Sequence, residues 1–186
     1  MIDITNRVLE KATKFSHTQI KRWAVAFLSP DKSTGQHSGV PRTYSIVEAI
    51  KIYLGGYLVE DLRFTISEAQ TIVKDVTEWF KINRWRVSDW IELRKSKMDR
   101  GFVAYSDFPW EGLIISVGMG SKENIFYEAK IVLKKQLIKE PSLWREEYRL
   151  EHFGKLSAIS TVPFRSIDIG SLITSLGNQI AQELSG

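Results

Sequence analysis

The spacing of hydrophobic residues changes part-way along the 186-residue chain. Up to about residue 80 they recur every three or four positions, the period of a helix with one buried face. From "LIISV" to "WREEYRLEHF" they alternate with polar residues, as strands do. The last segment returns to the helical period. We therefore predict an α+β protein: an α-helical domain over residues 1–80, followed by residues 81–186, a mainly antiparallel sheet with a C-terminal helix.

Capping residues mark the starts of two short helices near the N-terminus. Thr5 is suited to be the N-cap of the first, which carries Val8, Leu9 and Ala12 on one side and stops near Phe15. Thr18 can cap the second. Two short helices across a tight turn form a helix-turn-helix.

Two further helices are predicted by capping boxes, in which Ser or Thr is followed three residues later by Glu. Ser45 and Glu48 start a third helix, which we expect Gly55 and Gly56 to close. Its core-facing residues are predicted to be Ile46, Ala49, Ile50 and Tyr53. Thr65 and Glu68 start a fourth helix with one apolar face, made of Ile66, Ala69, Val73, Val76 and Phe80.

The second helix and the loop after it combine aromatic and basic residues. Helical spacing turns Ile20, Trp23 or Ala24, and Phe27 inward, and leaves Gln19, Lys21, Arg22 and Val25 nearer solvent. Pro30 ends the helical register, and residues 29–40 are rich in Ser, Thr and Gly. This loop has the composition of a wing, the hairpin-like loop that contacts DNA in winged helix-turn-helix proteins.

Three motifs resemble the winged helix-turn-helix of MerR-type transcription regulators. The family's recognition helix reads roughly L-R-Y-W-E-R-E-F, and this chain has "IKRWAVAF" at 20–27, with Ala24 in place of an acidic residue. The family's wing closes on Arg-x-Tyr-Ser/Arg, here "RTYS" at 42–45. Its G-F/Y-T-I/L-x-E-A pattern is here "RFTISEA" at 63–69. The resemblance covers about residues 5–80 and implies a regulator that binds double-stranded DNA.

The resemblance assigns roles to the exposed polar side chains. The second helix would enter the major groove, which admits one helix, while the wing reaches the flanking backbone. Arg and Lys supply phosphate charge there, and hydroxyl groups donate to phosphate oxygens. The candidate DNA-binding residues are Thr18, Gln19, Lys21, Arg22, Lys32, Arg42 and Tyr44.

Charge and composition are consistent with this interpretation and exclude other chemistries. The net charge is +4, and the segment from Lys14 to Lys51, with six basic and two acidic residues, carries all of it. The chain has no cysteine, which excludes disulfides and thiolate sites, and its three histidines are too scattered for a local metal site. Without a signal peptide or an apolar span, we expect a soluble cytoplasmic protein. Because no catalytic triad, local metal site or phosphate-cradling loop can be assigned, we expect that it uses no cofactor and is not an enzyme.

Other functions have weaker support. Asp107, Glu128 and Lys130 resemble the D…ExK arrangement of metal-dependent nucleases, but strand alternation puts Ile125, Tyr127 and Ala129 on one apolar face and Glu128 and Lys130 on the other. A phage or mobile-element packaging or excision factor could use the same winged domain, and a protein-interaction module could carry the basic helix incidentally. Tryptophans between the domains could also form a pocket for an unidentified small-molecule effector.

Tight specific binding favours two copies across a pseudo-palindromic site. MerR-type regulators dimerise through a coiled coil after the fourth helix, but residues 83–86 interrupt any such heptad run here. We therefore expect a homodimer formed by the sheet segments and the last helix. That helix runs from Ser166 or Asp168 to Leu184, and its apolar stripe contains Leu172, Leu176 and Ile180.

Overall fold

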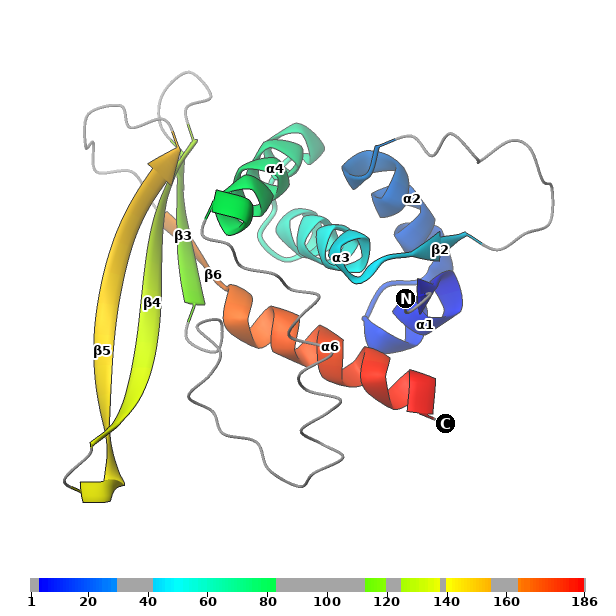
Figure 1. The fold of residues 1–186 in the computed structure, drawn as a ribbon. Coiled ribbons are helices and arrows are strands. Elements are labelled where there is room, and N and C mark those ends of the chain that lie inside the picture. Colours follow the sequence, from blue (N-terminus) through cyan, green and yellow to red (C-terminus); the bar gives the residue numbers. More distant parts are fainter. Residues whose placement is uncertain are drawn as a thin grey trace. The chain divides into compact units, whose positions relative to one another are not determined.

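A computed structural model describes residues 4–29, 42–82, 113–119, 125–137, 140–154 and 164–185. It has the predicted α+β composition (Figure 1). The chain divides into two compact units, the first made of Met1–Glu92 with Ser175–Gly186 and the second of Leu93–Thr174. Residues 30–40 of the predicted wing, and a helix that the spacing of apolar residues suggests for 85–98, lie outside the described residues.

In the described part of Met1–Glu92, the first unit has two very short strands and four helices, and it also includes the C-terminal part of the last helix. Its elements are β1 (Ile4–Thr5), α1 (Asn6–Ala12), α2 (His17–Phe27), β2 (Thr43–Tyr44), α3 (Ile46–Glu60) and α4 (Ile66–Ile82). β1 and β2 pair antiparallel, with Ile4 opposite Tyr44. This pairing joins the start of α1 to the residues that lead into α3.

Three of the predicted helix starts are confirmed by their hydrogen bonds. Thr5 Oγ1 accepts a bond from Val8 N at 3.4 Å. The Ser45 and Glu48 box is complete, because Glu48 N donates to Ser45 Oγ at 3.3 Å and Ser45 N to Glu48 Oε2 at 2.8 Å. Thr65 and Glu68 make the same pair of bonds at the start of α4. Each box satisfies two amide groups that the helix itself leaves unpaired.

The predicted N-cap of α2 is wrong. Ser16, not Thr18, caps this helix: its Oγ accepts from Gln19 N at 3.3 Å, and its own amide donates to Gln19 Oε1 at 2.9 Å. A residue that forms both halves of a capping box satisfies two orphan amides, whereas Thr18 has no Glu or Gln three residues later. Thr18 is an exposed residue inside the first turn of α2.

The prediction that Gly55 and Gly56 end the third helix is also wrong. Both are buried inside α3, which continues to Glu60. A Cβ placed at Gly55 would lie 2.3 Å from Phe27 Cδ2, and one at Gly56 would lie 2.5 Å from a Phe15 ring atom. The glycines therefore let aromatic rings approach the backbone of α3, a role of glycine that does not require the helix to stop.

The core of the first unit lies where α3 meets α2 and α4 (Figure 1). From α2 it takes Ile20, Trp23 and Ala24, as the helical spacing predicts, while Phe27 is half-buried. On α3, Ala49 and Ile50 are buried, and Ile46 and Tyr53 are half-buried. The apolar face of α4 is confirmed apart from a half-buried Ile66; the buried residues there are Ala69, Ile72, Val73, Val76, Trp79 and Phe80.

The turn between α3 and α4 contains a residue with a left-handed backbone. Arg63 has φ 58° and is the only non-glycine residue with positive φ in the described part of the chain. Phe64 N donates across this turn to Leu58 O at 3.0 Å. This bond caps a carbonyl at the end of α3. Arg63 carries some backbone strain in the turn, because its conformation is one that glycine adopts readily and other residues do not.

The second unit contains the predicted antiparallel sheet. Its strands are β3 (Leu113–Met119), β4 (Ile125–Leu137), β5 (Glu140–Gly154) and β6 (Phe164–Asp168), in the order β5-β4-β3-β6 (Figure 1). Every neighbouring pair is antiparallel. β6 was not predicted, because residues 164–168 are too few to show a clear alternation.

The last helix, α6 (Ile169–Ser185), follows β6 directly. Asp168 caps it, since Asp168 Oδ1 accepts from Ser171 N at 2.8 Å, and the alternative start at Ser166 is wrong because Ser166 belongs to β6. Leu176 and Ile180 are 0% and 1% exposed. The stripe that we expected to pair two copies is therefore already covered within the chain.

Gly56→Ala should destabilise the first unit although alanine favours a helix. The added methyl meets rings that are 2% and 0% exposed, those of Phe15 and Trp23, so they cannot move aside into solvent. Overpacking of about 1 to 3 kcal/mol exceeds the helix-propensity gain of about 1 kcal/mol. We expect a lower free energy of unfolding in denaturant titrations.

Thr71→Ala, at an exposed position of α4, provides the control for this measurement. It should change stability by no more than about 0.5 kcal/mol. A Gly56→Ala protein as stable as the wild type would contradict the close approach described for α3.

Candidate nucleic-acid interface

The outer face of α2 carries four exposed side chains in one stripe. Thr18, Lys21, Arg22 and Val25 are all exposed. Their spacing of three, one and three positions places them on the same side of a helix. The opposite side of α2 is held in the core by Ile20, Trp23 and Ala24. We call these four residues the α2 outer stripe.

The two cations of this stripe differ in their contacts. The guanidinium carbon of Arg22 lies 4.8 Å from the centre of the Trp23 ring, within the range of a cation–π contact. Trp23 itself is 0% exposed, so Arg22 is stacked on a buried residue. Neither cation makes an ion pair within the described residues. Arg22 is thus the more preorganised of the two groups.

Gln19 was predicted to face DNA but has another role. Its Oε1 accepts from both the amide and the hydroxyl of Ser16, at 2.9 and 3.0 Å. Its Nε2 lies 3.4 Å from Glu60 Oε1. Contacts with a base would require Gln19 to give up the capping box at the start of α2. The structure therefore assigns it to holding the helix rather than to the outer stripe.

Tyr44 was also predicted to face DNA, yet it is 2% exposed. Its hydroxyl donates to Asn6 Oδ1 at 2.9 Å, which ties β2 to α1. The guanidinium carbon of Arg42 lies 5.2 Å from the Tyr44 ring centre. Tyr44 therefore supports Arg42, a half-buried cation, from the core.

Burial raises the pKa of the Tyr44 hydroxyl above its ordinary value of 10.0, and the positive charge of Arg42 opposes this rise. Burial likewise raises the pKa of Tyr53, with the opposing charge coming from Lys14. Both hydroxyls are consequently neutral at physiological pH. They belong to the framework of the first unit rather than to its reactive groups.

Most of the remaining candidates can be placed. Thr18, Lys21 and Arg22 are brought together on α2, Arg42 lies just before β2, and Lys32 falls outside the described residues. Val25 was missed as a candidate, although the helical spacing already turned it toward solvent. Its side chain is 81% exposed.

The described part of the second unit offers little support for a nuclease centre. Tyr127 and Ala129 are buried, and Glu128 and Lys130 lie on the other, half-buried face of β4, as the alternation predicts. No group of three or more metal-binding side chains occurs among the described residues, and Asp107 is outside them. A search for spanning segments over the same residues finds no helix with the length and apolarity to cross a membrane.

The chain was compared with protein families, curated proteins and solved structures. No family model, no curated protein and no solved structure matches the chain.

The tyrosine environment predicts a loss of stability at alkaline pH. A raised pKa in the folded state means that the unfolded chain loses its phenolic protons first, so stability is complete below about pH 10 and falls as pH rises further. Tyr44→Phe and Tyr53→Phe should each make this fall shallower in denaturant titrations between about pH 9 and pH 11. An unchanged slope in both variants would contradict the assignment.

Proposed function

We propose that the first unit binds double-stranded DNA in a sequence-specific manner through the α2 outer stripe, and that the chain acts as a transcription regulator. The supporting observation is the stripe itself, in which adjacent cations lie between a hydroxyl and an exposed valine on a helix whose other face is buried. A helix anchored in this way can present its outer side chains without reorganisation. The net positive charge of the chain acts in the same direction.

The dimensions of α2 suit a major groove. Its 11 residues make a rod of about 16 Å, and a groove about 12 Å wide admits one such helix. Arg22 can donate two bonds to a guanine edge, and Lys21 can neutralise a neighbouring phosphate. Val25 lies one turn further along, where its methyl groups can contact the methyl group of a thymine.

A pair of chains on one DNA site remains part of the proposal. One helix reads only a few base pairs and buries too little surface for tight specific binding. Because the apolar stripe of α6 is buried, the sheet is the better candidate for pairing. Among the described strands, β5 lies at an edge of the sheet and has 15 residues. The addition of a strand to such an edge is a common mode of association.

The first test measures binding of the full chain to duplex DNA as salt is raised. Release of condensed counterions predicts a steep loss of affinity, with a log-log slope of several units for a dimer. Light scattering of the complex gives the number of chains, and sequencing of captured genomic fragments separates promoter sites from the ends or junctions that a packaging or excision factor would bind. Absence of duplex binding at about 50 mM salt contradicts the proposed function.

The second test separates the roles within the outer stripe. Arg22→Ala should reduce discrimination between specific and random DNA by about 1 to 3 kcal/mol, whereas Lys21→Ala should weaken binding to both alike. Lys74→Ala removes an exposed lysine from α4 and is the charge-matched control for Lys21→Ala. Equal effects of Arg22→Ala on specific and random DNA would show that α2 does not read bases.

Val25 can be tested by removing the group it is proposed to contact. Replacing thymine by uracil in the bound site deletes only the methyl group, which should weaken wild-type binding by about 1 kcal/mol at the contacted position. The Val25→Ala protein should be insensitive to that replacement. If the uracil replacement weakens binding equally in the wild type and in Val25→Ala, the contact is excluded. The effects of the two changes on the binding free energy would then be independent and add.

A further inference from the structure

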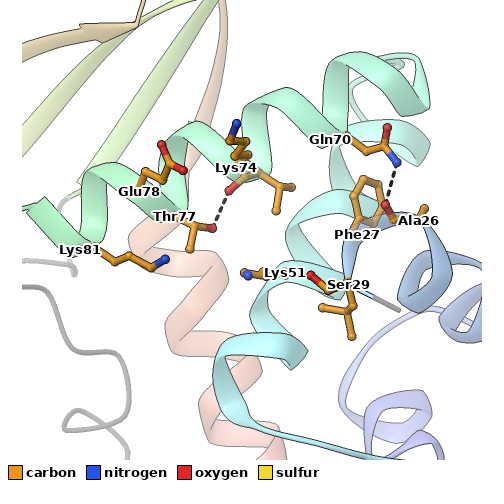
Figure 2. A pocket seen from close by; sticks show the side chains of 11 residues that line it. Ala26, Phe27, Ser29, Lys51, Gln70, Lys74, Thr77, Glu78 and Lys81 are labelled. Carbon is orange, nitrogen blue, oxygen red and sulfur yellow. Dashed lines mark hydrogen bonds between the residues drawn. The ribbon is translucent and has the colours of Figure 1, made fainter. Parts of the chain in front are cut away.

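A hollow lies beside the C-terminal end of α2, within the first unit (Figure 2). Its volume of about 360 Å³ lies within the range of small-molecule sites. Its walls are formed by the end of α2 and the residues just after it, together with α3 and α4. The lining residues that matter here are Phe27, Ser29, Lys51, Val73 and Lys81.

Two ammonium groups point into this hollow. In Figure 2 the side chains of Lys51 from α3 and Lys81 from α4 point toward one another, while those of Lys74 and Glu78 point away. Neither Lys51 nor Lys81 makes an ion pair within the described residues. Like charges that converge without a carboxylate between them repel, and an anion placed between them would remove that repulsion.

Helix ends offset part of this positive charge. A helix C-terminus carries about half a negative charge, and both α2 and α4 end beside the hollow, with Lys81 in the last turn of α4. Two ammonium groups against two such ends leave an excess of about one positive charge. An anionic group such as a phosphate monoester fits that excess.

The remaining walls indicate what the anion is attached to. The half-buried Phe27 and Val73, which is 4% exposed, both line the hollow, so part of its wall is apolar. The Thr77 hydroxyl already donates to Val73 O at 2.5 Å, whereas the Ser29 hydroxyl is exposed beside Lys51 in Figure 2. An aromatic or aliphatic body would cover the apolar wall.

We propose that this hollow binds a small ligand made of a phosphate group on an apolar body, and that the ligand regulates α2. The regulatory half rests on the proposed DNA-binding function. The ligand would touch Phe27, whose ring meets Gly55 of α3, and would lie beside Ala26, whose carbonyl accepts from Gln70 Nε2 at 2.8 Å. The bound phosphate adds negative charge beside the end of α2, which opposes the approach of DNA phosphates to the outer stripe, and DNA must lower the affinity for the ligand by the same factor.

Phenyl phosphate is a suitable probe because it carries a phosphate group on an aromatic ring. Inorganic phosphate, which has no apolar part, is the comparison ligand. Amide chemical shifts of the full chain are followed in NMR titrations of the wild type and of Lys51→Met, Lys81→Met and Lys74→Met. We expect phenyl phosphate to bind more tightly than inorganic phosphate, with shifts near Phe27 and Lys51. Loss of either converging ammonium should weaken binding about tenfold, and Lys74→Met should leave it within about twofold.

Three results would overturn the site. The first is that phenyl phosphate shows no saturable binding. The second is that Lys74→Met loses as much affinity for phenyl phosphate as Lys81→Met does. The third is that phenyl phosphate binds no more tightly than inorganic phosphate. Lys51 is half-buried, so its variant is used only if its amide spectrum stays dispersed; Lys81 is exposed, and its variant decides the question by itself.

DNA binding is then measured with and without phenyl phosphate. A change in DNA affinity on addition of phenyl phosphate supports regulation by the ligand. An unchanged DNA affinity contradicts regulation but not the ligand site. Weaker DNA binding by Lys51→Met without ligand would instead show that DNA phosphate occupies the hollow, which overturns the proposal. If the chain binds no DNA at all, the DNA-binding function fails and the titrations still decide the ligand site.

Discussion

The arrangement of the first unit depends on the close approach of aromatic rings to the backbone of α3. Gly55 and Gly56 leave the space that Phe15, Trp23 and Phe27 fill. This packing is strong enough to bury Trp23 Nε1 without a hydrogen-bond partner among the described residues, a loss worth about 1 to 3 kcal/mol. With α2 seated in this way its outer stripe must face solvent, and Phe27 reaches the wall of the hollow. The proposed DNA interface and the proposed ligand site thus depend on the same packing of α2 against α3.

Local signals in the sequence predicted much of this fold, and they failed where distant residues intervene. The boxes of Ser45 and Thr65 were correct because a capping box involves only four consecutive residues. The same pattern at Ser16 was overlooked in favour of Thr18, although Gln19 completes it. Gly55 was interpreted as a stop because nothing in its neighbourhood reveals the ring of Phe27, which lies on another helix.

The candidate site was predictable to the extent that it follows helical spacing. Lys21, Arg22 and Val25 lie on the exposed face because the apolar residues between them fix the other one. The burial of Tyr44 was not predictable, since it depends on the pairing of β2 with β1 and on Asn6. The hollow is a tertiary feature in the same sense: residues from three helices form it, and no spacing along the chain brings Lys51 to Lys81.

In the sheet of the second unit, the number of strands paired with β4 changes along its length. β3 pairs with β4 only from Ile125 to Ile131, while β5 continues beside β4 to Leu137, so the two longest strands extend beyond their neighbour as a ribbon (Figure 1). Within the described residues, backbone groups in this ribbon have a partner strand on one side only. Amide hydrogen exchange should therefore rise in an alternating pattern beyond Ile131, and local opening of the sheet should begin at the tip of the ribbon and spread toward β3.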